Sequence, residues 1–295
     1  MDYTENEKRS GPSAAECRNS NETWKQKLRQ EMVISGYSPK TITMYLCYFS
    51  EFAGYAKKPM EKVERGDIVA FLAEKKEKGN VSNATLALAH ASLHFFFHKV
   101  LGNKIVEDVK IAKKAKKLPT VLTKEEVRAL ILATPPKRDR LIVEFLYSSG
   151  CRVSECVKLK TESINFKERI ASIQGGKGNK DRIIILSSEW VKRAKKYIEK
   201  KKVKTPYVFS KKNGWPISSD TVQRMVKKAA KKAGLERRVT PHTLRHSYAT
   251  HLLEAGESIR KIQELLGHTD LSTTQIYTKV SLQELKKVKS PLDRL

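Results

Sequence analysis

Apolar residues recur at helical spacing through the first third of the chain. Ser38 and Pro39 mark the start of one helix, because serine caps a helix well and proline suits its first position. The spacing predicts four helices, at residues 24–33, 39–53, 67–78 and 82–101. Four helices of this length can enclose a core of their own. We therefore expect a helical domain at residues 22–109, after a mobile polar tail at residues 1–21.

The pattern changes beyond residue 110. A basic run, KKAKK, followed by Leu118 and Pro119 predicts a linker at residues 110–120. Thr123 and Glu126 have the spacing of a capping box, which starts a helix. Helical periodicity then predicts helices at residues 127–133, 140–149, 189–202, 219–233, 241–255, 259–266 and 272–277. Alternation with period two predicts antiparallel strands at residues 164–166, 169–173 and 181–186.

These elements define the expected fold class, which is mainly α with a small antiparallel β-sheet. The second domain is expected to be an α+β unit at residues 121–281. Within it, the sequence GGKGNK predicts a turn between the second and third strands. The segment LQELKKV, at residues 282–288, can form a short amphipathic helix in a C-terminal tail at residues 282–295.

Charge bears on the partner of the protein. The chain has 59 Lys and Arg against 32 Asp and Glu, a net charge of +27. The excess is uneven, with +7 on residues 1–117 and +20 on residues 118–295. Such a basic chain is typical of proteins that bind nucleic acids, because neutralising phosphates releases condensed counterions. A lysine-rich proteome or a need for solubility would produce the same composition, so charge alone assigns no reaction.

Composition also excludes several classes of protein. No segment approaches the roughly 18 consecutive apolar residues of a membrane-spanning helix. Residues 1–20 lack the apolar core of a secretory signal. The four cysteines, at positions 17, 47, 151 and 156, do not make a disulfide framework. We expect free thiols in a reducing cytoplasm and no association with a membrane.

The segment from Thr240 to His246 is the first candidate for chemistry. Thr240 is a good helix cap and Pro241 a good first residue, so His242 and Arg245 fall in the first turn and share a face. The amide-rich start of a helix favours anions, and a guanidinium beside an imidazole suits a phosphate. An amphipathic helix with a solvated polar face explains the same residues.

Arg152 and Lys177 are two further cationic candidates. Glu155 lies three residues after Arg152, where its carboxylate would orient the guanidinium, although an ordinary surface ion pair has the same spacing. Lys177 lies among glycines in the predicted turn, from which it would reach a phosphate or a leaving oxygen. The turn is not a nucleotide-binding P-loop, since no Ser or Thr follows the lysine and no helix follows the turn. An ordinary basic turn is the alternative.

His268 and Tyr277 are the last candidates along the chain. His268 follows Gly267, which is a candidate helix C-cap, and Tyr277 lies nine residues further, on a short predicted helix. A phenol with a pKa near 10 attacks poorly unless cations stabilise its phenolate. A buried tyrosine on an amphipathic helix is the alternative.

The histidines fall into two groups that raise the question of a metal. His90, His94 and His98 are spaced by four, as are His242 and His246. This spacing can chelate zinc, but no HExxH motif and no third ligand accompany it. We therefore expect no metal site.

Taken in order, these segments closely resemble the signature of the tyrosine site-specific recombinases of the phage integrase family. The motifs are GCRVSE at 150–155, GKGNKDR at 176–182, HTLRHS at 242–247, LLGH at 265–268 and TTQIYT at 273–278. The sequence HTLRHSYATHLLEAG is most similar to the Xer branch of that family. The resemblance covers about residues 24–287, weakly before Arg152 and strongly after it. It implies an N-terminal SAM-like core-binding domain and a mostly helical catalytic domain.

The resemblance also implies how the phosphate is attacked and held. Tyr277 would be the nucleophile that attacks a DNA phosphodiester, forming a 3′-phosphotyrosyl intermediate and releasing a 5′-hydroxyl. Arg152 and Arg245 would hold the non-bridging oxygens, a role that suits planar, forked donors.

The remaining roles implied by the resemblance concern proton transfer. Lys177 would donate a proton to the leaving 5′-oxygen, and His242 would assist proton transfer from the tyrosine. His268 would donate a hydrogen bond to the phosphate or position Tyr277. The covalent bond stores the phosphodiester energy, so the resemblance implies no cofactor, no ATP and no obligatory metal.

Partners are likewise implied by the resemblance. They are double-stranded DNA with specific recombination sites and a homotetramer that exchanges strands between two duplexes through a Holliday junction. Residues 282–288 would dock on a neighbouring subunit. The expected role is resolution of chromosome or plasmid dimers at the nucleoid. The state of the protein without DNA, monomer or dimer, is left open, as is activation by a DNA translocase.

Three alternatives share parts of this pattern. An integrase of a mobile element would have the same catalytic residues and differ in its DNA sites and partners. A type IB topoisomerase uses a similar set of residues but relaxes supercoils as a monomer. The non-enzymatic alternative is a DNA-binding protein with an inactive site, which a complete set of six candidate residues disfavours.

Overall fold

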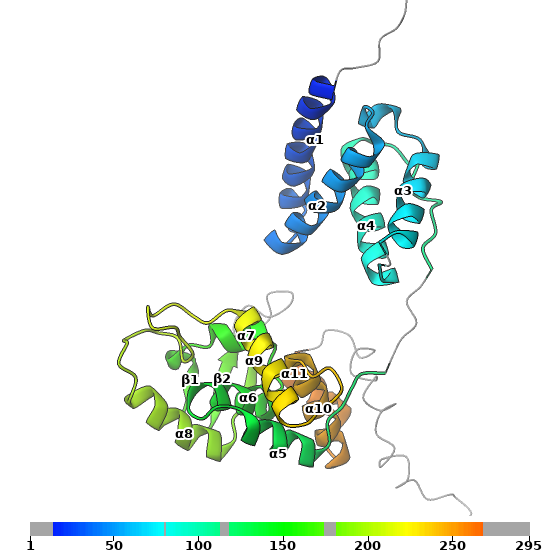
Figure 1. Ribbon diagram of the computed structural model, residues 1–295. Coiled ribbons are helices and arrows are strands. Elements are labelled where there is room, and N and C mark those ends of the chain that lie inside the picture. Colours follow the sequence, from blue (N-terminus) through cyan, green and yellow to red (C-terminus); the bar gives the residue numbers. More distant parts are fainter. Residues whose placement is uncertain (1–13, 80, 113–117, 174–180, 268–295) are drawn as a thin grey trace, which may run out of the picture. The chain divides into compact units, whose positions relative to one another are not determined.

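The computed structural model describes residues 14–79, 81–112, 118–173 and 181–267 (Figure 1). The chain forms two compact units, Met1–Lys116 and Lys117–Leu295. The predicted turn with Lys177, the segment with His268 and Tyr277, and the predicted docking helix at 282–288 lie outside the described residues.

The first unit contains helices and turns but no strand in its described part. Its elements are α1 (Ala14–Ile34), α2 (Pro39–Ala56), a 3-10 turn (Met60–Lys62), α3 (Arg65–Glu77), α4 (Asn83–Phe95) and a π-helical turn (Phe96–Val100). α2 begins where the sequence predicts, because the Ser38 hydroxyl accepts a hydrogen bond from the Thr41 N–H at 3.2 Å. α1 begins at Ala14, so residues 14–21 of the predicted tail are helical.

Aromatic rings fill the core of the first unit. Phe49 and Phe96 have ring centroids 4.4 Å apart, and Trp24 meets Phe96 edge-on at 5.7 Å. Three consecutive phenylalanines, at 95–97, are all buried. The helix predicted at 82–101 changes from α to π at this point. The π turn is wider, which lets neighbouring side chains face the same core.

The second unit combines helices with a small sheet, so the predicted fold class is confirmed. Its helices are α5 (Lys124–Ala133), α6 (Arg138–Ser149), α7 (Val153–Lys158), a 3-10 turn (Thr161–Ser163), α8 (Ser188–Glu199), α9 (Ser219–Lys232), α10 (Pro241–Glu254) and α11 (Ile259–Leu266). The strands are β1 (Ile164–Asn165), β2 (Ile170–Ile173) and β3 (Arg182–Ile185). They pair antiparallel in the order β1-β2-β3.

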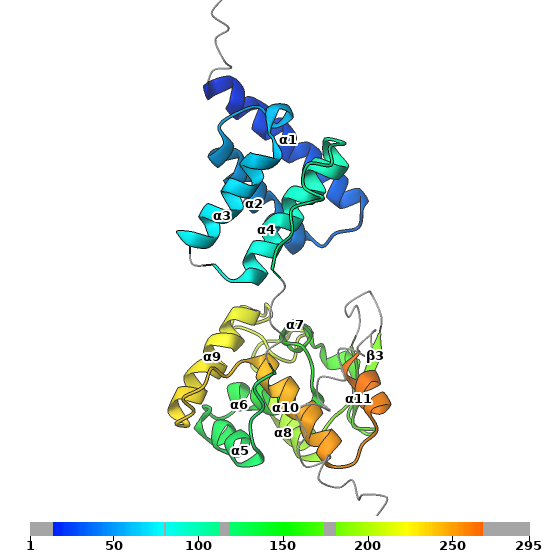
Figure 2. The ribbon, with the colours of Figure 1, turned by 90° about the vertical axis from the view of Figure 1, so that its right-hand side faces the viewer.

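α6 is the central helix of the second unit, with every residue from Leu141 to Leu146 buried. The Trp190 side chain of α8 donates a hydrogen bond to the Leu141 carbonyl at 2.9 Å. α10 lies beside α6 (Figure 2), and the two helices approach closely where α6 ends at Gly150. A Cβ at Gly150 would lie 2.4 Å from the Tyr248 ring, and the residue has φ +61°. Glycine is therefore required at the turn that leads into Arg152.

No helix in the described ranges combines the length and the apolar character needed to cross a bilayer.

Phe49→Ala should destabilise the first unit selectively, because each unit encloses its own hydrophobic cluster. Truncating a buried phenylalanine costs about 3–5 kcal/mol of unfolding free energy. In calorimetry of the whole chain, we expect one unfolding transition to move to lower temperature. Phe145→Ala, in the other core, should move the other transition. A single transition that shifts equally in both variants would contradict two independent cores.

Candidate active site

Arg152 lies where α6 gives way to α7. α6 ends at Gly150 in a left-handed conformation, and Arg152 is the N-cap residue of α7. Its backbone N–H donates to Glu155 Oε2 at 2.7 Å, and its Nη1 donates to Glu155 Oε1 at 2.9 Å. Glu155 thus holds both the backbone and the side chain of Arg152, as the spacing of the two residues suggested.

Arg245 reaches the same place from α10. The Thr240 hydroxyl caps this helix by accepting from the Thr243 N–H, and the first turn directs the Arg245 side chain inward. Arg245 is 4% exposed, and its Nη1 donates to the Gly150 carbonyl at 2.7 Å. Its Nη2 donates to the Leu266 carbonyl at 2.7 Å.

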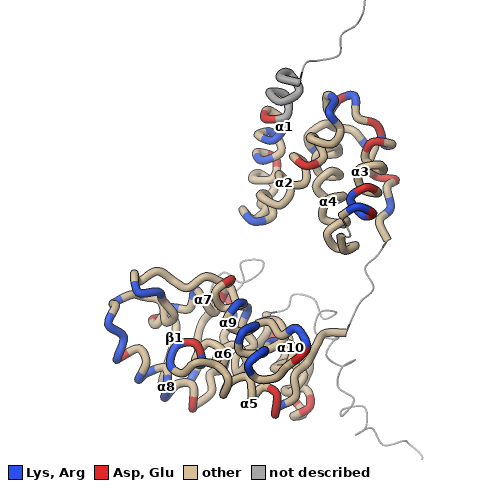
Figure 3. Tube along the Cα trace, in the orientation of Figure 1, with Lys and Arg blue, Asp and Glu red and all other residues tan. Residues whose placement is uncertain are grey.

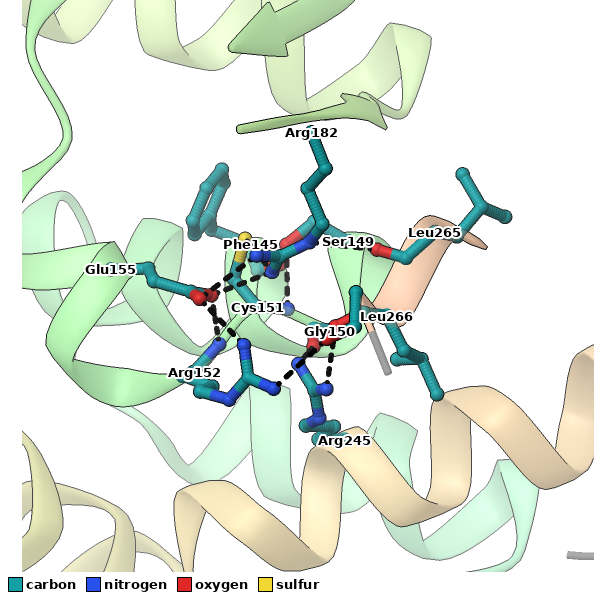
Figure 4. A network of polar contacts seen from close by, with 11 residues as sticks. Phe145, Ser149, Gly150, Cys151, Arg152, Glu155, Arg182, Arg245, Leu265 and Leu266 are labelled. Atoms are coloured by element: carbon teal, nitrogen blue, oxygen red, sulfur yellow. Dashed lines mark hydrogen bonds and ion pairs between the residues drawn. The ribbon is translucent and has the colours of Figure 1, made fainter. Parts of the chain in front are cut away.

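The two guanidinium groups share their anchoring points. Arg152 Nη2 donates to the Gly267 carbonyl at 3.3 Å, beside the Leu266 carbonyl that Arg245 binds. Figure 4 shows both side chains converging on this turn from different helices. The structure therefore brings together Arg152 and Arg245, which lie far apart in the sequence.

Arg182 is a third guanidinium at the site, and sequence reasoning gave it no role. It lies at the start of β3, and its two terminal nitrogens donate to the two carboxylate oxygens of Glu155, at 2.9 and 2.6 Å. Its Nε donates to the Leu265 carbonyl at 3.0 Å. Strand alternation contained a signal for it, because Arg182 shares a face of β3 with the buried Ile184. We call Arg152, Arg182, Arg245 and Glu155 the arginine cluster.

Glu155 remains ionised within this cluster. Burial alone would raise the pKa of its carboxyl, but the hydrogen bonds and positive charge of Arg182, followed by the bonds from Arg152, lower the pKa to about 2. The Cys151 thiol is different, because burial raises its pKa to about 11 and keeps it protonated. Three guanidinium groups against one carboxylate leave an excess of positive charge, which suits a phosphate.

His242 lies in the first turn of α10 and is exposed at the surface. Partial desolvation, followed by the positive charges of Arg245 and Arg152, lowers the pKa of its imidazole below the ordinary 6.5. The imidazole is therefore neutral near pH 7 and can accept a proton. Burial lowers the pKa of the next histidine on this helix, His246, to about 4.

Lys177, His268 and Tyr277 lie outside the described residues. α11 ends at Leu266 and is capped by Gly267 in a left-handed conformation, as predicted, and His268 is the next residue in the sequence. Among the residues that the structure describes, no three His, Cys, Asp or Glu side chains are arranged to hold a metal ion.

Two family patterns match the chain. That of the phage integrase family matches residues 120–284, and that of the N-terminal SAM-like domain of phage integrases matches residues 24–107. The tyrosine recombinase XerA of Pyrococcus furiosus is 42% identical over 260 residues, which cover 86% of this chain and 88% of that protein.

Solved structures are similar as well. The crystal structure of XerA recombinase is 29% identical, with a TM-score of 0.54 over 90% of this chain and 96% of that chain. XerH recombinase, in a post-cleavage complex with a palindromic difH substrate, has a TM-score of 0.71 at 22% identity. The match covers 93% of this chain and 83% of the XerH chain. At this level of identity it shows a similar fold.

Glu155→Gln should destabilise the second unit in a pH-dependent way. Because folding lowers the pKa of Glu155 from 4.5 to about 2, its stabilising contribution is complete above 4.5 and is lost as the pH falls toward 2. The difference in unfolding free energy between wild type and Glu155→Gln should therefore shrink over this range, as measured by urea denaturation at several pH values. Glu162→Gln, at a carboxylate that is 71% exposed, is the control and should show no such change. A constant difference for Glu155→Gln would contradict the depressed pKa.

Proposed function

The chain belongs to the phage integrase family of tyrosine recombinases, which cut and rejoin DNA through a covalent tyrosine intermediate, and we propose that its arginine cluster holds the scissile phosphate. The observation that carries this proposal is the convergence of Arg152 and Arg245 on one turn of the chain. Both groups are fixed by hydrogen bonds to other groups of the chain. Preorganised donors stabilise developing charge without a reorganisation cost.

We propose that Tyr277 attacks the phosphorus. The tyrosine oxygen forms a bond to phosphorus, the bond from phosphorus to the 5′-oxygen breaks, and the DNA is left attached through a 3′-phosphotyrosine. Arg152 and Arg245 bind the non-bridging oxygens and neutralise the charge that develops on them. The same positive charge favours the phenolate, which a tyrosine with a pKa near 10 otherwise forms poorly at neutral pH.

Protons move in step with this exchange. His242 receives the proton of the tyrosine, which is supported by the lowered pKa of its imidazole. Lys177 donates a proton to the leaving 5′-oxygen, and His268 donates a hydrogen bond to the phosphate. Rejoining reverses these transfers when a 5′-hydroxyl attacks the phosphotyrosine, so no cofactor is consumed.

The two units divide this work in the proposal. Residues 22–109 bind the DNA on one side, and residues 121–281 carry out the chemistry. Lys and Arg recur along α8 and α9 of the second unit (Figure 3), which supports contact with phosphates there. We further propose a tetramer on two synapsed duplexes, with residues 282–295 docked on a neighbouring subunit.

The cellular role that fits best is resolution of chromosome or plasmid dimers at specific sites of the nucleoid in the cytoplasm. The support is the 42% identity to a XerA recombinase along 86% of the chain.

Tyr277→Phe should abolish covalent capture of DNA, because phenylalanine has no hydroxyl to attack phosphorus. A nicked suicide substrate with the recombination site traps the intermediate, since the fragment with the 5′-hydroxyl diffuses away. We expect a protein–DNA adduct on a denaturing gel with wild type and none with this variant. Tyr197→Phe, a half-buried tyrosine of α8, is the matched control and should retain the adduct. An undiminished adduct with Tyr277→Phe would remove this residue from the proposed role.

Lys177→Ala should slow cleavage of ordinary DNA but not of DNA with sulfur at the scissile 5′-bridging position. A thiol has a pKa of about 8.5, so a thiolate leaves without a proton donor. We expect the rate of adduct formation to fall with the oxygen substrate and to be largely restored with the sulfur substrate. Arg245→Lys should remain slow on both substrates, because it loses stabilisation of the phosphate oxygens. If sulfur restores neither variant, Lys177 does not act as the proton donor.

A further inference from the structure

Three consecutive carbonyl oxygens at the end of α11 each accept a hydrogen bond from a different arginine. The Leu265 carbonyl accepts from Arg182, the Leu266 carbonyl from Arg245 and the Gly267 carbonyl from Arg152. The last carbonyls of a helix have no partner within the helix and carry a partial negative charge. The end of α11 therefore accepts hydrogen bonds from all three arginines of the arginine cluster (Figure 4).

Arg152 and Arg182 connect the same two parts of the unit. Each binds the Glu155 carboxylate, and each also binds the end of α11. They differ in exposure, because the Arg152 side chain is 21% exposed and that of Arg182 is 8% exposed. Arg152 can thus face a substrate, while Arg182 lies behind it as a buried support.

We propose that Arg182 is a positioning residue that holds Arg152 and the C-terminal end of α11 in the geometry that binds the scissile phosphate. The proposal rests on the proposed role of Arg152. Because Arg182 binds both oxygens of Glu155, the guanidinium of Arg152 contacts through a single nitrogen, Nη1, a carboxylate whose charge is already offset. The charge of Arg152 is then available to the phosphate.

The packing around Arg182 is specific to its shape. A Cβ at Gly267 would lie 2.8 Å from Arg182 Cδ, so the glycine leaves room for the side chain as it passes the end of α11. Only a guanidinium can bind both carboxylate oxygens and a backbone carbonyl at once from one rigid group. Lysine, with one ammonium, cannot bind all three in the same geometry.

Loss of Arg182 should therefore slow the reaction more than it weakens DNA binding. For Arg182→Gln and Arg182→Lys, we expect the rate constant of adduct formation at saturating protein to fall about tenfold or more. The dissociation constant for the same duplex should change less than about threefold, since many phosphate contacts contribute to it. Equal changes in rate and affinity, or an unchanged rate, would overturn the proposal.

A matched control separates positioning from a general loss of stability. Arg193 of α8 binds through Nη1 the buried carboxylate of Glu144 at 2.6 Å, and Glu144 lies on α6 before the end of this helix that leads to Arg152. Arg193→Gln also removes the partner of a buried carboxylate, and its rate of adduct formation should stay within about twofold of wild type. If Arg193→Gln forms the adduct as slowly as Arg182→Gln, then loss of any buried ion pair slows the reaction, and the specific positioning role of Arg182 is contradicted. If Arg182→Gln does not fold, Arg182→Lys keeps the charge and provides the measurement.

A double-variant cycle tests whether Arg182 acts through Arg152. If it does, Arg182→Gln should slow the Arg152→Lys protein much less than it slows wild type. If the two substitutions slow adduct formation independently, so that their fold-changes multiply in the double variant, the positioning role is overturned. The two proposals fail in different ways: a wild-type rate with Arg152→Lys alone would contradict the proposed function. A slow Arg152→Lys protein together with a wild-type rate for Arg182→Gln would contradict only the positioning role.

Discussion

A carboxylate shared between two guanidinium groups determines how the second unit presents its positive charge. Glu155 binds Arg152 through Nη1 and Arg182 through both of its terminal nitrogens. Buried charges are costly unless they are paired, and neighbouring guanidinium groups repel one another. The carboxylate and the carbonyl oxygens at the end of α11 offset both costs. Positive charge is thereby held in place by the chain itself, and electrostatic stabilisation of a transition state, as we propose for this site, depends on such fixed groups.

The ends of three helices supply the framework for this charge. α6 ends at Gly150 and offers a carbonyl to Arg245, while its buried length fixes that end within the core. α10 begins at Pro241, and the partial positive charge at its start favours an anion. α11 ends at Leu266, and the partial negative charge there favours the arginines. The end of α11 thus orients the guanidinium groups, and the start of α10 favours the phosphate that we propose they bind.

The sequence predicted the features that depend on local chemistry. Ser38 and Thr240 cap helices as expected, and the three-residue spacing of Arg152 and Glu155 gives a contact. It did not predict the contact of Arg182 with Glu155, because strand and helix lie far apart in the chain and many surface arginines look alike. Backbone carbonyls as arginine partners were also missed, since any residue type supplies a carbonyl. The roles of Lys177, His268 and Tyr277 depend on the family resemblance.

The π-helical turn at Phe96–Val100 shows a different limit. The apolar pattern at 82–101 is that of one continuous helix, and the change of pitch depends on tertiary packing of the phenylalanines. Similarly, α1 extends to Ala14 through polar residues that show no apolar periodicity. At the π turn the helix was foreseen and its change of pitch was not, whereas residues 14–21 were predicted as a mobile tail and are helical.

The thiols of the chain differ in a way that affects how the protein can be labelled. Cys151 lies inside the arginine cluster but is buried and stays protonated, so it is a poor nucleophile toward maleimides and oxidants. Cys47 is exposed on α2 of the first unit. Once Cys17 is replaced by serine, a fluorophore can be attached at Cys47 without modifying the arginine cluster. Its emission would then report on the DNA contact that we propose for the first unit.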